Sequence, residues 1–498
     1  MEELPEALYA AVQAREIDRR VVLRRGPQAE PLMELAGRAL IELLCQRWPR
    51  ARRIAVVCGP GNNGGDGYVL ARLAQAAGIV PRVMCPGGPG DLKGETACAR
   101  ERLITSGVSP EPLDAAELAR MDVVVDALFG TGLERPVQGE WLSAIRAVND
   151  CGAPVLSVDV PSGLHSDTGR ILGEAVRATV TLALIGLKAG MFTGHGRECC
   201  GDISYDSLGL STDDLAAVVP LARRISDENL HGLLRPRPRC AHKGDAGRVL
   251  VVGGGPGMAG AAHLAGAAAY RVGAGLVTVA THPGHAACLG QTRPELMIQG
   301  IDCAGRLHQL LESADVIAVG PGLGQDRWAR ELWQGVRDSA RLLVVDADAL
   351  NLLAAEPVTR ENWILTPHPG EAGRLLGCAT TDIQNDRFAA VRAIAHRFGG
   401  VCVLKGSGTL VASGRDDPVW LCDRGNPGMA SGGMGDVLTG IIAGLAAQGL
   451  AVPDAARIGV WCHARAADEQ SVLDGERGLL ALDLLPGVRS LVNALAQP

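Results

Sequence analysis

The feature that most constrains the fold of this chain is a series of short β-branched runs, each ending in a loop that contains Gly, Asp or Pro. Helical patterns lie between most of these runs. Continuous apolar strands that alternate with helices indicate an α/β protein, whose mainly parallel sheets are covered on both faces. Ligands bind such folds at the carboxyl ends of the strands. The expected strands are Ile54–Cys58, Val123–Asp126, Val155–Asp159, Val180–Leu187, Val249–Val252, Leu276–Ala280, Val316–Val319, Leu342–Asp346, Trp363–Thr366 and Val401–Leu404.

A seam between two domains is expected between Ser211 and Lys243. A polar stretch at 226–229 precedes an alternating Arg and Pro run at 235–239, and both discourage regular structure. A new strand begins after Gly247. At 498 residues the chain has room for two or three domains. We therefore expect two domains, residues 1–222 and 223–498.

Composition excludes several classes of partner. The formal net charge is −7 and aromatic residues make up 3% of the chain, so neither a basic patch nor a stacking platform for nucleic acid is expected. No run reaches the roughly 18 apolar residues of a membrane span, and no signal peptide is recognisable at the N-terminus. The 14 cysteines are scattered without CxxC spacing, which is typical of reduced thiols. We expect a cytoplasmic protein.

The turn at 432–436, Gly-Gly-Met-Gly-Asp, combines an anion site with a carboxylate. Backbone N–H groups are free at a helix N-terminus, where the helix dipole favours anions. Asp436 lies beside them and could accept a proton during phosphate chemistry. A structural loop with a capping Asp is the alternative, since short motifs are weak evidence. Gly440 and Gly444 would let the following helix pack closely, and its apolar face consists of Val437, Leu438, Ile441, Ile442 and Leu445.

A glycine-rich segment, 58–67, follows the first expected strand and leads to a helix expected from Tyr68. Its glycines would allow close approach of a phosphate, and Asn62, Asn63 and Asp66 add oxygen atoms. A structural turn is the alternative.

Two further strand ends carry the segments 126–136 and 159–163. Asn63, Asp126 and Ser162 are oxygen donors at three strand ends, and together they would suit a monovalent cation. A helix N-cap is the alternative for each Asp alone. Lys188 ends another strand and could contact a phosphate or be solvated.

The motifs GNNGGDG, DALFGTG and VDVPSG together resemble the N-terminal domain of the YjeF family, the NAD(P)H-hydrate epimerases, over about residues 10–215. The resemblance implies a Rossmann-like three-layer αβα domain. It also implies that Asn63, Asp126 and Ser162 hold K⁺, and we take Asp159 as the candidate for proton transfer near C6 of the nicotinamide ring. The residues implied to contact the hydrated dinucleotide are Asn62, Asn63, Gly64, Gly65, Asp66, Gly130, Thr131, Gly132, Leu133, Glu134, Arg135, Pro136 and Asp159.

Four strand ends of the second half carry polar motifs: GPGLG at 320–324, DADALN at 346–351, TPHPGE at 366–371 and KGSGT at 405–409. The last offers a cation, free N–H groups and hydroxyls, which suit nucleotide phosphates. His368 stands between two prolines, a rigid placement that favours a ligand contact or proton transfer.

In this order, and together with GMGDVLTGIIA, these motifs resemble the ADP/ATP-dependent NAD(P)H-hydrate dehydratases of the ribokinase-like superfamily, over about residues 225–495. The segment 253–260 departs from the family, whose members often have Ser and Tyr there. The resemblance implies a ribokinase-like αβα domain. The implied nucleotide-binding residues are Lys405, Gly406, Ser407, Gly408, Thr409 and Gly435, and those implied for the hydrate are Ala261, Gly322, His368 and Asp436.

The two resemblances imply a bifunctional enzyme that epimerises and dehydrates the NAD(P)H hydrates NADHX and NADPHX. Asp436 would take the proton of the C6 hydroxyl, which attacks the terminal phosphoryl of ADP or ATP; phosphate then leaves and NAD(P)H is regenerated. Mg²⁺ would assist, with Glu371 a candidate ligand. The alternative is a ribokinase-like kinase for a small alcohol or vitamin precursor with a non-catalytic N-terminal binding domain. The joined architecture resembles the bacterial, ADP-using type, and we expect a homo-oligomer.

Overall fold

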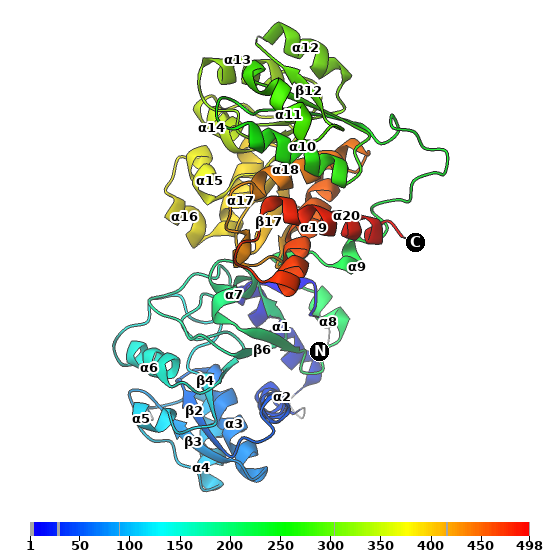
Figure 1. Cartoon of the computed structure of the whole chain (residues 1–498). Helices are drawn as coiled ribbons and strands as arrows, with labels where there is room; N and C mark the ends of the chain where they lie inside the picture. The colour runs from blue at the N-terminus through cyan, green and yellow to red at the C-terminus, as the bar shows by residue number, and fades with distance from the viewer. Residues whose placement is uncertain (1–3, 27–29, 89, 303, 415–416, 498) are drawn as a thin grey trace. The chain divides into compact units, whose positions relative to one another are not determined.

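A computed structural model of the chain describes residues 4–26, 30–88, 90–302, 304–414 and 417–497. The chain divides into two compact units, Met1–Arg223 and Arg224–Pro498 (Figure 1). Each unit is an α/β fold with its own sheet. In the described residues no helix has both the length and the apolar character needed to cross a bilayer.

The N-terminal unit is built on a parallel sheet with strand order β3-β2-β4-β5-β6-β8. Its strands are β2 (Arg53–Cys58), β3 (Val80–Met84), β4 (Val123–Ala127), β5 (Val155–Val158), β6 (Val180–Leu184) and β8 (Asp202–Asp206). Its helices are α1 (Ala11–Arg25), α2 (Leu32–Arg47), α3 (Asn62–Ala76), α4 (Gly94–Thr105), α5 (Ala115–Leu118), α6 (Gly139–Asp150), α7 (Gly196–Cys199) and α8 (Thr212–Ala216). Helices α2 and α3 cover one face of the sheet, and α5 and α6 the other (Figure 1).

Alternate residues of the central strands are buried in two separate hydrophobic cores, one on each face of the sheet. In β2, Ile54 and Val56 join the cluster under α2 and α3, whereas Ala55 and Val57 join the cluster under α6. Side chains of a strand alternate between its faces, so a strand that is apolar throughout needs a cover on both. This confirms the three-layer αβα arrangement expected for this half.

Helix α3 begins at Asn62, six residues before the expected start at Tyr68. The glycine-rich segment is therefore mostly helix, and its glycines serve packing. A Cβ on Gly64 would lie 2.0 Å from the carbonyl oxygen of Gly59, and one on Gly65 would lie 2.4 Å from the Met33 side chain. The expected helix start is wrong, whereas the close approach of a phosphate to these glycines stays a prediction; the structure adds that Gly64 and Gly65 allow the helix to pack closely.

The expected strand Val180–Leu187 is broken at Ile185, whose φ is 68°. The chain turns there into a short strand, β7 (Leu187–Lys188), which pairs with β1 (Ala7–Tyr9). Strand β1 in turn pairs antiparallel with β9 (Ala222–Arg224). The pairing of β7 with β1 fixes the backbone of Lys188.

In the C-terminal unit, the strands from β12 to β16 run parallel in the order β12-β11-β10-β13-β14-β15-β16, followed by antiparallel β17 and β18. The six strands expected in this half are all present. The antiparallel pair β17–β18 and the edge strand β12 were not expected. The strands are β10 (Arg248–Val252), β11 (Leu276–Thr281), β12 (Met297–Gly300), β13 (Val316–Val319), β14 (Leu342–Val345), β15 (Trp363–Leu365), β16 (Val401–Leu404), β17 (Thr409–Ser413) and β18 (Val419–Cys422).

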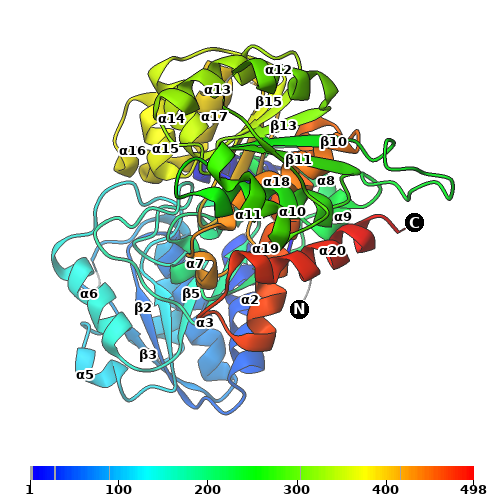
Figure 2. The same ribbon diagram turned by 45° about the horizontal axis from the view of Figure 1, so that its top comes forward.

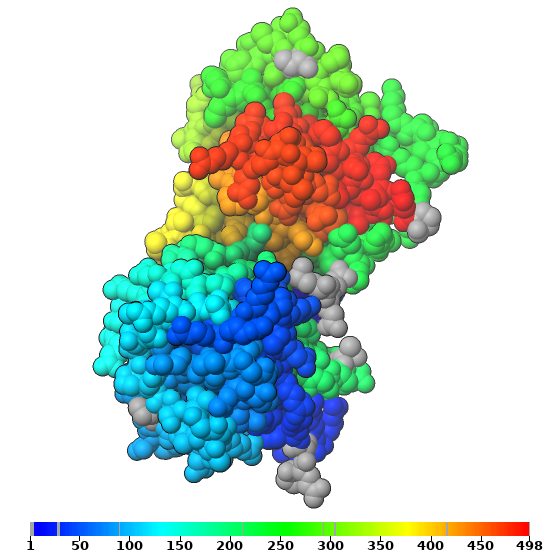
Figure 3. All heavy atoms as spheres, turned by 60° about the horizontal axis from the view of Figure 1, so that its bottom comes forward, coloured from blue at the N-terminus to red at the C-terminus, as the bar shows by residue number. Residues whose placement is uncertain are grey.

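Helices cover both faces of this sheet (Figure 2). On one face lie α10 (Ala259–Arg271), α18 (Met434–Ala447), α19 (Val452–Asp474) and α20 (Leu484–Leu495). On the other lie α12 (Ala304–Ser313), α13 (Arg327–Arg337), α14 (Ala347–Ala355), α15 (Pro369–Leu376) and α17 (Arg387–Phe398). Shorter helices are α9 (Asp227–Leu230), α11 (Ala286–Thr292) and α16 (Thr380–Asn385). Helices α19 and α20 pack side by side at the surface of this unit (Figure 3).

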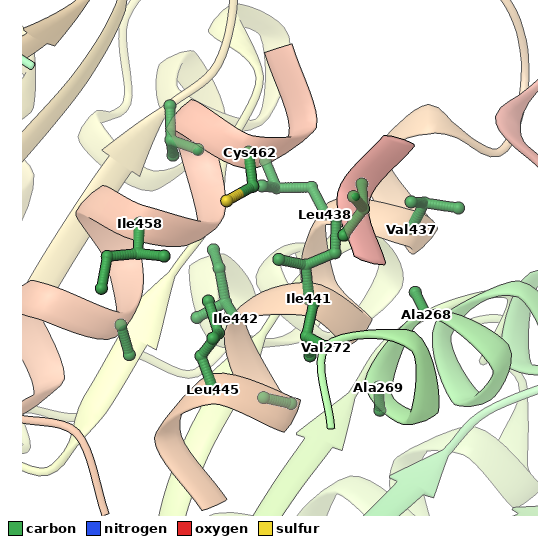
Figure 4. Close-up of a cluster of buried hydrophobic side chains, with 14 of the residues drawn as sticks. Ala268, Ala269, Val272, Val437, Leu438, Ile441, Ile442, Leu445, Ile458 and Cys462 are labelled. Atoms are coloured by element: carbon green, nitrogen blue, oxygen red, sulfur yellow. The ribbon is translucent and has the colours of Figure 1, made fainter. Parts of the chain in front are cut away.

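Helix α18 packs against α10, whose Ala268, Ala269 and Val272 lie beside it (Figure 4). Its glycines allow this close approach, as expected. A Cβ on Gly440 would lie 2.0 Å from the carbonyl oxygen of Ala265, and one on Gly444 would lie 2.6 Å from that of Ala269. The predicted apolar face is buried at all five positions. The close contact holds the N-terminus of α18 at a fixed place above the sheet.

Candidate active sites

A cavity of about 810 Å³ opens in the N-terminal unit at the carboxyl ends of β2, β4 and β5. Most of the predicted contact residues line it: Asn62, Asn63, Asp66, Gly130, Thr131, Gly132, Leu133, Glu134, Arg135 and Asp159. Gly64, Gly65 and Pro136 are not among its lining residues. Helix α1 adds Arg15 and Asp18 to the wall, which the motif analysis had not assigned to the site.

An ion pair between Asp159 and Lys188 lies in this cavity. Asp159 follows β5 with a φ of 64°, a conformation that side chains other than glycine rarely adopt. Its Oδ1 accepts hydrogen bonds from Lys188 Nζ and from the Leu184 backbone N–H, the latter at 3.0 Å. Lys188 Nζ also donates to the Leu184 carbonyl at 2.8 Å, and the side chain is only 2% exposed. The solvated alternative for Lys188 is therefore wrong, because β7 carries it into the interior.

Two more carboxyl groups share this environment. Burial raises the pKa of Asp18 to about 6, with Lys188 lowering it and Asp159 raising it. Burial also raises the pKa of Asp66 well above its usual range, and the neighbouring Asp159 adds to the effect. The cavity thus holds two carboxyl groups with raised pKa values, one of them about 6, beside a buried ammonium group, which suits acid–base chemistry.

The three residues expected to hold K⁺ lie around the loop after β4. Ser162 donates to Asp126 through its hydroxyl at 2.6 Å and its backbone N–H at 2.9 Å, and Ser157 Oγ donates at 2.9 Å. A Cβ on Gly130 in that loop would lie 3.1 Å from Asn63 Oδ1. Asn63 Nδ2 is buried without a hydrogen-bond partner among the described residues. A carboxylate, a hydroxyl and an amide oxygen fit a monovalent cation by type, and the same bonds tie the loops after β4 and β5 together.

The centre of the second site is Asp346, which follows β14 and is buried. Its Oδ1 accepts from Lys405 Nζ at 2.7 Å and its Oδ2 from Thr439 Oγ1 at 2.8 Å. Lys405 follows β16, and Thr439 lies on α18. One carboxylate therefore joins the lysine of the predicted nucleotide loop to the helix that carries Asp436. The DADALN motif predicted a functional site at this strand end, but its spacing did not predict that Lys405 and Thr439 would contact Asp346.

The turn before α18 has the expected form. Gly433 caps the helix with a φ of 91°, and the N–H groups of Met434, Gly435 and Asp436 belong to the first helical turn, which has no intrahelical acceptors. A Cβ on Gly435 would lie 3.3 Å from Lys405 Nζ, so the turn and the lysine face one another closely.

Asp436 has the electrostatic character of a general base. Burial, together with the charges of Asp346 and Asp348, raises the pKa of its carboxyl to about 7, while Lys405 opposes the shift. A base whose pKa lies near the working pH is the most effective proton acceptor. Behind the turn, the buried His463 of α19 is hydrogen bonded to the backbone of Met434, and burial lowers the pKa of His463 to about 4.

His368 is the N-cap of α15. Its Nδ1 accepts from the N–H of Gly370 at 3.0 Å and of Glu371 at 3.4 Å, so the ring proton lies on Nε2, 3.4 Å from Glu371 Oε1. Glu371 Oε2 accepts from the His368 N–H at 2.8 Å and lies 3.8 Å from Lys405 Nζ. The half-exposed imidazole remains available to a ligand.

The candidate protein ligand for the Mg²⁺ expected from the resemblance is Glu371. The oxygens of the candidate ligand Glu371 are engaged by His368 and Lys405. Within the described part of the chain, no three His, Cys, Asp or Glu side chains are grouped so that they could hold a metal ion. We therefore assign no protein ligands to Mg²⁺.

Gly322 and Ala261 meet at the carboxyl ends of β13 and β10. Gly322 has a φ of 57°, and a Cβ there would lie 2.8 Å from the Met258 Cβ and 3.0 Å from the Ala261 Cβ. This contact lies at the carboxyl ends of the strands, as do Asp346 and Lys405. Since the strands are parallel, their carboxyl ends lie on the same side of the sheet. Every predicted residue of the second site lies near these ends or on α18 above them.

Comparison with known proteins matches the two halves of the chain to two different family models. A family model described as NAD(P)H-hydrate dehydratase matches residues 249–486, and one described as YjeF-related protein N-terminus matches residues 29–190. The chain is 46% identical to a bifunctional NAD(P)H-hydrate repair enzyme of Coxiella burnetii, with 98% of this chain and 99% of that protein covered. Identity to the enzyme of the same description from Escherichia coli is 42%, covering 98% and 95%. A ribokinase-like superfamily protein of Enterococcus faecalis matches 55% of this chain and 96% of its own at 29% identity and a TM-score of 0.51.

Proposed function

The chain belongs to the family of bifunctional NAD(P)H-hydrate repair enzymes, and from this membership we propose which residues carry its two reactions. The N-terminal unit epimerises the R and S hydrates of NADH and NADPH, and the C-terminal unit dehydrates the S form. The observation that carries the assignment for dehydration is the Asp436 carboxyl, whose pKa is raised to about 7 opposite Lys405.

For dehydration, we propose that Asp436 accepts the proton of the C6 hydroxyl as the oxygen attacks the terminal phosphoryl group of ADP or ATP. The bond from that phosphorus to the bridging oxygen breaks, and AMP or ADP leaves with the bonding electrons. Lys405 and the N–H groups at the start of α18 stabilise the negative charge of that phosphoryl group. The C6–O bond then breaks, phosphate leaves with its electrons, and the lone pair of the ring nitrogen forms a double bond to C6. Loss of a proton from C5 returns that electron pair to the nitrogen and gives the C5=C6 double bond of the dihydronicotinamide. Mg²⁺ bound to the nucleotide would neutralise phosphate charge.

The nucleotide loop is proposed to be Lys405, Gly406, Ser407, Gly408 and Thr409, with Gly435 facing it. Ala261, Gly322 and His368 would hold the hydrate against Asp436. The joined architecture supports ADP as the phosphoryl donor, by resemblance to the bacterial type. The free thiols of the described cysteines support a cytosolic location.

For epimerisation, we propose that Asp159 moves protons at the C6 hydroxyl while Lys188 orients its carboxylate. The hydrogen bonds from Lys188 Nζ and the Leu184 N–H fix Asp159 Oδ1, which leaves Oδ2 for the substrate. K⁺ near Asn63, Asp126 and Ser162 would supply positive charge beside the loop 130–135.

The test is an incubation of the protein with both hydrate epimers and ADP or ATP. Recovery of the 340 nm absorbance of NAD(P)H with loss of both epimers is expected. A stable phosphorylated product would instead support the kinase alternative. Consumption of the S epimer alone would contradict the epimerase assignment.

The pH dependence of dehydration follows from Asp436. The carboxyl must be ionised to accept a proton, and its raised pKa means that the ionised fraction grows as the pH rises through about 7. We expect kcat/KM to fall tenfold for each pH unit below that value. The rate of dehydration of purified S hydrate, measured from pH 5.5 to 8.5, checks this; a profile flat down to pH 5.5 would contradict it.

A further inference from the structure

Arg387, the first residue of α17, lies buried behind the loop 405–409. Its side chain is on the inner side of the loop, whereas Gly406 and Ser407 are exposed on the outer side. Neither the motif pattern nor the proposed mechanism assigns a role to this arginine. A guanidinium group is seldom buried without specific partners, and those of Arg387 include backbone carbonyls of this loop.

The guanidinium group holds the carbonyl groups on both sides of the loop. Arg387 Nη2 donates to the carbonyl oxygens of Leu404, Lys405 and Gly408, each at 3.3 Å. Nη1 donates to Gln384 Oε1 at 2.9 Å, which anchors the guanidinium group. Carbonyl groups at the start and near the end of the loop thus contact the same guanidinium group.

This arrangement sets the direction of a peptide N–H. In a trans peptide the C=O and N–H bonds point in opposite directions. Because the Lys405 carbonyl points inward at Arg387, the N–H of Gly406 points outward. An outward N–H beside Lys405 Nζ can donate to a phosphate oxygen.

Gly406 fits the guanidinium group closely. Its φ of 136° is a conformation open mainly to glycine, and a Cβ there would lie 3.0 Å from Arg387 Nη1 and 3.2 Å from Nη2. The glycine is needed both for the turn and for the contact with Arg387.

The charge of Arg387 adds to this effect. Burial lowers the pKa of Arg387 to about 10, so the group stays protonated at neutral pH. The loop therefore has a cation behind it as well as the Lys405 ammonium beside it, and both favour an anionic ligand.

We propose that Arg387 is a positioning residue for the adenine nucleotide: it holds the loop 405–409 in the conformation that binds the phosphates, without contacting them. The inference rests on the proposed function of that loop. It predicts that loss of Arg387 weakens nucleotide binding while the hydrate site, built on other strand ends, keeps its affinity.

The test uses Arg387→Met and Arg387→Lys in the full chain. Calorimetric titration with ADP and MgCl₂ should show about a tenfold or greater rise in Kd for Arg387→Met, equivalent to roughly 1.4 kcal/mol. Arg387→Lys keeps the charge and reaches fewer carbonyls, so an intermediate rise is expected. The KM for ADP should rise in parallel, with the KM for the S hydrate unchanged.

Arg360 offers a matched control. Its guanidinium group also donates to backbone carbonyls, those of Arg337, Ser339 and Arg341. Arg360 precedes β15, however, and so lies at the amino end of that strand, away from the nucleotide loop. Arg360→Met should lower the melting temperature and leave the Kd for ADP unchanged.

The possible results distinguish a failure of the positioning role of Arg387 from a failure of the proposed nucleotide binding. Wild-type affinity for ADP in both Arg387 variants would overturn the positioning role. Equal weakening by Arg360→Met would also overturn it, since the effect would then be one of general stability. If Arg387→Met fails to fold, Arg387→Lys decides between these outcomes. No binding of ADP or ATP by the wild-type chain would refute the proposed function itself.

Discussion

Replacement of Asp436 by Asn is expected to lower the rate of dehydration by about three orders of magnitude, within the range typical of a lost general base, and to leave epimerisation unchanged. Asn keeps the shape of the side chain but cannot accept the proton of the C6 hydroxyl at neutral pH. The phosphoryl group would then face a neutral hydroxyl, a poor nucleophile. The measurement is kcat for S hydrate and ADP, beside the rate of R-to-S conversion in the same preparation.

Binding of ADP should survive this change. Lys405, Gly435 and the loop 405–409 remain in place, and the variant removes a negative charge from the neighbourhood of the phosphates. We therefore expect an equal or lower Kd for ADP. A fall in dehydration together with a loss of ADP binding would mean that Asp436 holds the nucleotide site together, not that it acts as the base.

Asp348 provides a matched control for charge. It raises the pKa of Asp436 and accepts a hydrogen bond from the Gly324 N–H at 2.8 Å. Asp348→Asn should keep most of the activity and move the pH profile of dehydration toward lower pH, because one repulsive charge is gone.

Residual dehydration above a tenth of the wild-type rate in Asp436→Asn would show that another group is the base.

The sequence predicted the layers of both units because strands buried on both faces are continuously apolar. Ten expected strands correspond to strands of the structure, with ends that differ by a residue or two except at Val180–Leu187. The break at Ile185 was not predictable, since its left-handed conformation is imposed by contacts of the folded chain and leaves no mark in hydrophobic patterning. The strands β17 and β18 were not predicted, although the sequence after each contains Gly and Asp, Gly414 and Asp417 after β17 and Asp423 and Gly425 after β18.

Site residues at strand ends were easier to predict than their partners. Lys405 and Asp436 stand beside a glycine, and Asp126 and Asp159 each have one four residues further on, a local signal that needs no knowledge of the fold. Asp18 and Arg387 lie in ordinary helical segments, and only the folded chain brings them to a cavity or a loop. Gly64 and Gly65 have a second role that the sequence pattern does not predict, since they allow close packing of α3.

Replacement of Lys188 by Met is expected to abolish epimerisation and also to destabilise the N-terminal unit. The methionine is of similar length, but it leaves the Asp159 carboxylate without its buried cation. Removal of one partner from a buried ion pair typically costs about 3–5 kcal/mol. The lower end applies here, because the Asp159 side chain is 16% exposed and water reaches it from the cavity. Dehydration of the S hydrate should be unchanged at temperatures where both units stay folded.

The double variant Asp159→Asn with Lys188→Met separates stability from catalysis. Loss of both charges removes the unpaired carboxylate, so the midpoint of thermal unfolding should return toward the wild-type value. Epimerisation should remain abolished, because no ionised group is left at that position to move the proton. Recovery of epimerisation together with stability would contradict the role of Asp159 and would make Asp18, the remaining carboxyl group with a pKa near 6, the candidate for proton transfer.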